Sequence, residues 1–162
     1  MTQYSWPGPV PPGGRQGTIQ LVRCAGCGRP LYHTKAKGQP RQEDHEQGCE
    51  VFVTAMRVMR YADELNRSAS QSTALWGRGR RRRKYLRENA KRLSVAACTS
   101  DPAAELKTLG DLYQAESQTS GKRVKSPEET EMADMMTRAC GQLALGKDPA
   151  PITAENGLDL SS

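Results

Sequence analysis

Four potential metal ligands in the first third of the chain constrain its fold more than any other feature. Cys24 and Cys27 are separated by two residues, and His45 and Cys49 follow with three residues between them. Structural zinc takes four Cys or His ligands in a tetrahedron, and ligand pairs at such short intervals are typical of these sites. The spacing C-x2-C-x17-H-x3-C therefore predicts one structural zinc ion bound by these four residues.

The residues around the first cysteine pair favour a tight turn that points both sulfur atoms at one metal ion. Gly26 and Gly28 flank Cys27, and glycine tolerates the backbone conformations that such turns require. The segment 23–31 reads RCAGCGRPL and resembles the zinc knuckle of many zinc-finger families, whose pattern is C-x-x-C-G-x-x-L. The resemblance implies that both cysteines bind zinc from the turn.

Two short strands and a helix are expected around these ligands. Residues 18–23 and 30–33 have the composition of strands. Residues 42–65 lack proline and carry apolar side chains at helical spacing, so His45 and Cys49 would project from one helix face. The expected fold class is a small α+β zinc finger, a short β-hairpin plus helix of the ββα or treble-clef type. The interval of 17 residues exceeds the roughly 12 of a C2H2 finger, which requires an enlarged loop or a treble-clef variant.

Two alternatives to this ligand set remain open at the level of sequence. His33 follows Cys27 by six positions and competes with His45 for the third ligand place; we prefer His45 because it would share a helix face with Cys49. Cys24 and Cys27 could instead form a redox pair, but a thioredoxin-like C-x-x-C needs a βαβ context, which this polar chain lacks.

Composition supports a metal-bound, non-catalytic protein. Only 36% of the 162 residues are hydrophobic and one is Phe, so the core is small and metal binding would add to its stability. Five cysteines and no long apolar run favour reduced thiols inside the cell, in the nucleus or cytoplasm, with no membrane association. Four protein ligands leave no open position for a substrate, and no deaminase or HExxH pattern is present. We therefore expect no enzymatic activity.

A block of arginines lies downstream of the zinc ligands. Residues 78–92 contain nine lysines and arginines and one glutamate. The basic residues, taken as nucleic-acid contacts, are Arg78, Arg80, Arg81, Arg82, Arg83, Lys84, Arg87, Lys91 and Arg92. Guanidinium groups match phosphate oxygens, and each neutralised phosphate releases counterions. The block resembles the arginine-rich helices of lentiviral RNA-export proteins and lambdoid phage antitermination peptides, which implies RNA binding. A nuclear-localisation signal and a solvated helix face are the alternatives.

The rest of the chain divides by composition and periodicity. Two amphipathic helices, 101–116 and 127–145, are suited to packing on each other, on a protein partner or on a second copy of the chain. The predicted segments are a disordered Pro/Gly-rich arm at 1–17, the C2HC zinc finger with its long helix at 18–66, a hinge and arginine-rich basic helix at 67–98, two amphipathic helices at 99–146, and a disordered tail at 147–162.

These features lead to two function hypotheses of different classes. The first is a zinc-finger regulatory or accessory protein that binds nucleic acid, with RNA favoured over DNA. In composition alone the chain also resembles the cysteine-rich accessory proteins of some plant RNA viruses. The second is a structural or adaptor subunit of a ribonucleoprotein or virion, in which the basic block is a localisation signal or an RNA anchor.

Overall fold

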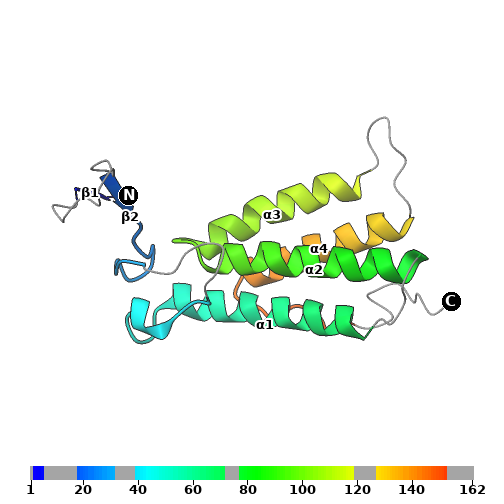
Figure 1. The fold of residues 1–162 in the computed structure, drawn as a ribbon, viewed down its shortest axis with the longest axis horizontal. Coiled ribbons are helices and arrows are strands. Elements are labelled where there is room, and N and C mark those ends of the chain that lie inside the picture. The colour runs from blue at the N-terminus through cyan, green and yellow to red at the C-terminus, as the bar shows by residue number, and fades with distance from the viewer. Residues whose placement is uncertain (1, 6–17, 32–38, 72–76, 119–126, 153–162) are drawn as a thin grey trace, which may run out of the picture.

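The computed structural model describes residues 2–5, 18–31, 39–71, 77–118 and 127–152. The helices in these ranges are α1 (Glu50–Ser70), α2 (Gly77–Ala97), α3 (Pro102–Ser117) and α4 (Pro127–Ala144), and a 3-10 helix covers Gln42–Asp44. Strand β1 (Thr2–Ser5) pairs antiparallel with β2 (Thr18–Leu21). Successive helices run in opposite directions and form an up-and-down bundle, with the knuckle at the end where α1 begins (Figure 1).

The α+β fold class expected from the sequence is wrong. The described part of the chain is an all-α helical bundle, and no β-hairpin of the zinc-finger kind forms in it. Strand β2 pairs with residues 2–5 and not with the segment after the cysteine turn, where an isolated bridge joins Arg23 to Pro30. Beside this bridge the Cys24 N–H donates to the Arg29 carbonyl oxygen and the Leu31 N–H to the Val22 carbonyl oxygen, each at 2.9 Å, and the residues that follow Leu31 lie outside the described ranges.

Helices α1 and α2 pack together through small and branched side chains. Buried residues on each recur at intervals of three and four, as on a helix with one core-facing stripe. They are Ala55, Val58, Ala62, Leu65 and Ala69 on α1, and Leu86, Ala90, Leu93 and Ala97 on α2. Because α2 buries this stripe within the bundle, only its outer side meets solvent.

Helices α3 and α4 form the second pair. The Asp101 carboxylate accepts a hydrogen bond from the Ala104 backbone N–H at 3.2 Å, and Pro102 occupies the first turn of α3, as the Asp-Pro sequence predicts. Gly146 lies two residues after Ala144, the last residue of α4, and its φ of +77° is the left-handed conformation that commonly follows a helix. Helix α4 buries Met132, Met135, Met136, Cys140 and Leu143. The three methionines of α4 thus belong to the core of this chain.

One buried polar contact joins the two helix pairs. The Tyr113 hydroxyl on α3 donates to Asn89 Oδ1 on α2, and Asn89 Nδ2 donates to the Tyr85 carbonyl oxygen at 2.7 Å. Tyr113 and Asn89 are 0% and 2% exposed, so these groups depend on each other for hydrogen bonds. The pairing fixes how α2 and α3 meet.

Residues 147–152 of the expected tail contact α1. Asp148 forms ion pairs with Arg57 at 3.3 Å and Arg60 at 3.9 Å. The Ile152 backbone N–H donates to Glu64 Oε1 at 2.9 Å, and its side chain packs on the core. None of the helices in the described ranges has both the length and the apolar composition of a membrane span.

Candidate functional site

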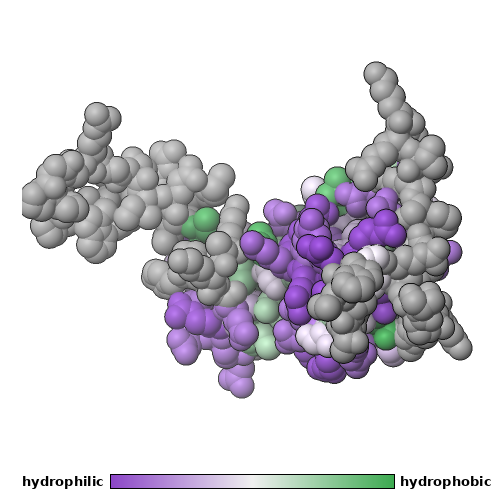
Figure 2. Space-filling model, turned by 45° about the vertical axis from the view of Figure 1, so that its right-hand side comes forward, coloured by the Kyte–Doolittle hydropathy of each residue, from purple (hydrophilic) through white to green (hydrophobic). Residues whose placement is uncertain are grey.

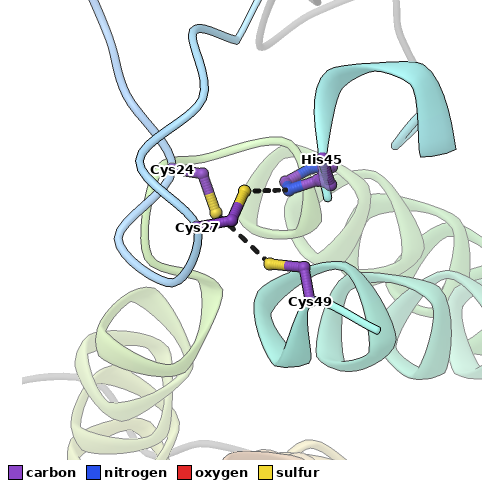
Figure 3. Close-up of side chains that lie close together, drawn as sticks. All are labelled: Cys24, Cys27, His45 and Cys49. Atoms are coloured by element: carbon purple, nitrogen blue, oxygen red, sulfur yellow. Dashed lines mark hydrogen bonds between the residues drawn. The ribbon is translucent and has the colours of Figure 1, made fainter. Parts of the chain in front are cut away.

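The four predicted zinc ligands converge at one end of the bundle. Cys24 and Cys27 come from the knuckle, His45 from the segment before α1, and Cys49 from the residue preceding α1 (Figure 3). Their ligand atoms all lie within 4.8 Å of one another. The structure therefore contains a Cys3His cluster that could hold one metal ion.

The distances of two ligand pairs in the cluster lie within about half an ångström of those expected around a tetrahedral zinc ion. Cys24 Sγ lies 3.6 Å from Cys49 Sγ, and Cys27 Sγ lies 4.0 Å from His45 Nδ1. Zinc–sulfur bonds of about 2.3 Å in a tetrahedron put two sulfurs about 3.8 Å apart, and a zinc–nitrogen bond of about 2.1 Å brings nitrogen slightly closer. The donor set of three thiols and one imidazole is typical of zinc.

Two glycines of the knuckle allow its tight turn and its close approach to α1. Gly28 has φ of +73°, which glycine adopts without strain. A Cβ atom on Gly26 would lie 2.8 Å from Val51 Cγ2 and 3.2 Å from Cys49 Sγ, so glycine permits the knuckle to approach α1 closely. The Gly26 N–H donates to Cys24 Sγ at 3.3 Å and the Glu46 N–H to Cys27 Sγ at 3.5 Å. These amides stabilise negative charge on the sulfurs.

The expected helical link between His45 and Cys49 is wrong. His45 is extended, with φ of −130° and ψ of 155°, and Cys49 is the N-cap of α1. Gly48, with φ of +78°, turns the chain between them. The two side chains therefore meet across a turn and share no helix face. His33 lies outside the described residues, so its competition with His45 stays open.

Two arginines and one aromatic ring pack around His45 and its neighbour Asp44. Arg29 Nη1 donates to the His45 carbonyl oxygen at 3.0 Å. Arg41 contacts the neighbouring Asp44 carboxylate with two nitrogens, each at 3.2 Å. Phe52 lies against the imidazole ring, with centroids 5.4 Å apart. The sequence did not predict these contacts, because none of them follows from the spacing of the metal ligands.

The two knuckle thiols differ in acidity. Burial raises the pKa of Cys24 to about 11, and the neighbouring Cys49 thiol adds to the rise. Burial also opposes ionisation of Cys27, but hydrogen bonds from the Glu46 and Arg29 backbone outweigh it and lower the pKa of this thiol. A bound cation would favour the thiolate form of all three cysteines.

The knuckle is docked onto the helical bundle. The Ala25 backbone N–H donates to the Ser100 carbonyl oxygen at 3.0 Å, and the Ser100 hydroxyl donates to the Arg23 carbonyl oxygen. Ser100 lies in the turn between α2 and α3. The metal cluster thus joins the knuckle to α1, and these hydrogen bonds join it to the α2–α3 turn.

Comparisons with known proteins give no relative: no family model, curated protein or solved structure matches the chain. The function of the metal cluster and of the basic helix must therefore be inferred from their own residues.

The arginine block begins at the opposite end of the bundle from the metal cluster. Cys49 precedes α1, whereas α2 starts beside the end of α1, about 30 Å away by the length of a 21-residue helix (Figure 1). Hydrophilic side chains cover most of the helical part in the face shown in Figure 2. The metal cluster and the start of the block are therefore separate sites.

The basic residues of the block fall into two groups. Arg80, Arg87 and Lys91 are exposed on the outer side of α2, and their side chains form no ion pair within the described residues. Lys84 lies between them and is 3.9 Å from Glu88. We call these four residues the outer row; Arg81 is also exposed.

Two of the remaining members, Arg82 and Arg92, contact other residues of the protein. Arg82 is half-buried, and its Nη2 lies 3.5 Å from Ser68 Oγ. Arg92 is 3.9 Å from Glu116 and sits over the Tyr113 ring, 5.8 Å from its centroid. Arg83 is half-buried, and the Arg78 side chain lies outside the described residues. Only part of the predicted contact set is thus directed to solvent.

Proposed function

We propose that the protein is an RNA-binding regulatory or accessory protein in which the outer row on α2 binds phosphates and a structural zinc ion holds the knuckle on the bundle. The observation that carries this proposal is the outer row itself. Four cations at positions 80, 84, 87 and 91 recur at helical intervals on the exposed side of a helix whose other side is buried.

The dimensions of the outer row suit a nucleic-acid backbone. Arg80 and Lys91 are eleven residues apart, about 17 Å along the helix axis. A strand that rises about 3.4 Å per nucleotide passes about five phosphates over this length. Within residues 78–92 the one acidic residue is Glu88, so this stretch lacks the alternating charge of an ordinary solvated helix face.

Binding by the outer row differs from the mode that the arginine-rich peptides suggest. Those peptides enter an RNA groove as single helices, whereas α2 has Leu86, Leu93 and the alanines of its inner stripe buried against other helices. A groove could not surround it. Surface contact along one strand agrees better with this packing.

The zinc ion would be structural. All four ligands come from the protein, and Cys24, His45 and Cys49 are 3%, 3% and 7% exposed. Such a closed site leaves no coordination position for a substrate, so we propose no enzymatic activity. Reduced thiols are required for this role, which supports an intracellular location.

The salt dependence of RNA binding tests the proposal. The zinc-loaded full chain is titrated into a labelled RNA at several salt concentrations between about 50 and 200 mM, a range over which the slope can be measured. Replacing Arg80, Arg87 and Lys91 with Gln should weaken binding and reduce the slope of log affinity against log salt by roughly 0.7 to 0.9 per lost phosphate contact.

A matched control removes positive charge elsewhere. Lys107 and Arg138 are exposed on α3 and α4, and changing both to Gln should leave the slope nearly unchanged. An outer-row variant that binds RNA as tightly as the parent would exclude this function. Tighter binding to duplex DNA than to RNA would retain the phosphate contacts and overturn the preference for RNA.

The second candidate, an adaptor subunit of a larger assembly, has its own support. Val53, Met56, Leu112 and Leu145 are exposed, at 45%, 39%, 44% and 74%, and exposed apolar side chains can mark a protein contact. Light scattering of the full chain and of a Leu112→Ser, Leu145→Ser variant tests for self-association. The same basic block would then serve as an RNA anchor or a nuclear-localisation signal.

A further inference from the structure

A groove of about 560 Å³ runs between α2 and α3 beside the outer row. Val95 and Ala96 on α2 and Leu109 on α3 line it with apolar atoms. Val95 and Leu109 are half-buried, so part of each remains open to a ligand. Volumes of this size suit small organic groups, which sites usually hold against an apolar surface with a few polar groups around it.

Charged residues surround these apolar atoms. Lys91, a member of the outer row, also lines the groove, together with Arg92 and Glu88 on α2 and Glu105 on α3. Arg92 and Glu88 already have partners in Glu116 and Lys84. Within the described residues the Glu105 carboxylate forms no ion pair or hydrogen bond. It is an acceptor directed to a ligand or to water.

We propose that this groove holds one unstacked base of the RNA strand that lies along the outer row. The proposal rests on the function proposed above and extends it from phosphates to bases. Lys91 links the two surfaces because it both ends the row and borders the groove. Unpaired bases of single strands expose their faces, which a duplex does not, and the apolar atoms of Val95, Ala96 and Leu109 offer a surface on which one face can lie. The preferred ligand is therefore a single strand.

The carboxylate of Glu105 gives the groove a preference among bases. An ionised carboxylate only accepts hydrogen bonds, and cytosine N4 is an amino donor that carboxylates accept from. Uracil carries an oxygen where cytosine carries this amino group, and its one donor on that edge, N3–H, lies between two carbonyl oxygens that repel a carboxylate. Strands of cytosine should consequently bind more tightly than strands of uracil.

Fluorescence anisotropy with labelled oligocytidylate and oligouridylate of equal length tests this inference on the zinc-loaded full chain. One hydrogen bond to a charged group corresponds to roughly a tenfold preference for the cytosine strand. Glu105→Ala should bring the ratio of the two affinities close to one. Glu131→Ala, which removes an exposed carboxylate on α4, should leave the ratio unchanged.

The outcomes separate this inference from the proposed function. Equal affinities for the two strands, with a steep salt dependence, would exclude the base site and leave the outer row as the RNA site. No binding of either strand would exclude both. A cytosine preference that survives Glu105→Ala would overturn the assignment of Glu105. If Glu105→Ala changed the oligomeric state measured by light scattering and left the ratio of affinities unaltered, the groove would be a protein interface instead.

Discussion

The hydroxyl of Ser100 donates a hydrogen bond to the carbonyl oxygen of Arg23, 77 residues earlier in the chain. Together with the bond from the Ala25 N–H to the Ser100 carbonyl oxygen, it attaches the knuckle to the turn between α2 and α3. A metal ion bound by the Cys3His cluster would fix the same knuckle to α1 through Cys49. Metal binding and bundle stability should therefore be coupled, because both depend on the position of residues 23–27.

Removal of the metal should destabilise the whole bundle. A ligand that binds the folded chain alone adds about 4 kcal/mol when its free concentration is a thousandfold above Kd. We expect a chelator to lower the melting temperature, which circular dichroism at 222 nm measures. Cys24→Ser should have the same melting temperature as the parent chain with chelator. Cys98→Ala, a buried thiol outside the cluster, should keep one zinc per chain. Unchanged melting without metal would show that the knuckle does not support the bundle.

The identity of the histidine ligand can be tested by metal analysis. The imidazole Nδ1 of His45 lies 4.0 Å from Cys27 Sγ, and Arg29 donates to the backbone carbonyl oxygen of the same residue. The variant His45→Ala should therefore no longer bind one zinc ion per chain. His33→Ala should retain it. The opposite pattern would assign the third ligand place to His33 and leave His45 as a packing residue against Phe52.

Some of the fold follows from the sequence and some does not. The start of α3 at Pro102 was predictable because Asp101 caps a helix through its own carboxylate, a local interaction. The strand pairing was not, because β2 pairs with residues 2–5 and not with the segment after the cysteine turn, and the choice between two partners is not a local property. The convergence of the cluster was predicted although the assumed helix was wrong. Short ligand spacing requires only that the chain turn back, and the turn at Gly48 suffices.

Contacts between distant segments could not be read from local patterns. Ser100 and Arg23 meet only when the knuckle and the α2–α3 turn are both in place. Likewise, helical spacing places Leu86 and Leu93 on one face of α2, where both are buried, but it does not show that Arg92 contacts Glu116. Helical periodicity assigns a side chain to a face, whereas its partner depends on how the helices pack.

Close packing at Gly26 should control metal affinity. A Cβ at this position would press on Val51 and on the Cys49 sulfur, so Gly26→Ala must displace either α1 or the knuckle. Overpacking of this kind costs about 1–3 kcal/mol, and we expect it as weaker zinc binding in competition with a chromogenic chelator. Gly141→Ala on α4, where a Cβ meets nothing within 4 Å, is the matched control. Equal affinities would mean that the knuckle can shift without disturbing the ligands.

Alkaline pH should destabilise the bundle through its buried tyrosines. Burial raises the pKa of Tyr113 from 10 to about 12, whereas the nearby Arg92 guanidinium lowers it in part. The unfolded chain releases this proton near pH 10 and the folded chain holds it until about pH 12. The stabilisation is therefore complete below pH 10 and is lost between pH 10 and 12, by about 2–3 kcal/mol at 1.4 kcal/mol per pKa unit.

Urea unfolding at pH 8 and at pH 11 measures the part of this loss that has occurred at pH 11, which is about half of it. Burial also raises the pKa of Tyr61 and Tyr85, so these residues contribute with the same sign. Tyr113→Phe should be less stable than the parent at pH 8 by about 1–3 kcal/mol, because Asn89 Oδ1 loses its buried donor. It should nevertheless lose less stability than the parent between the two pH values. An equal loss in parent and variant would show that the proton on Tyr113 does not contribute to the alkaline transition.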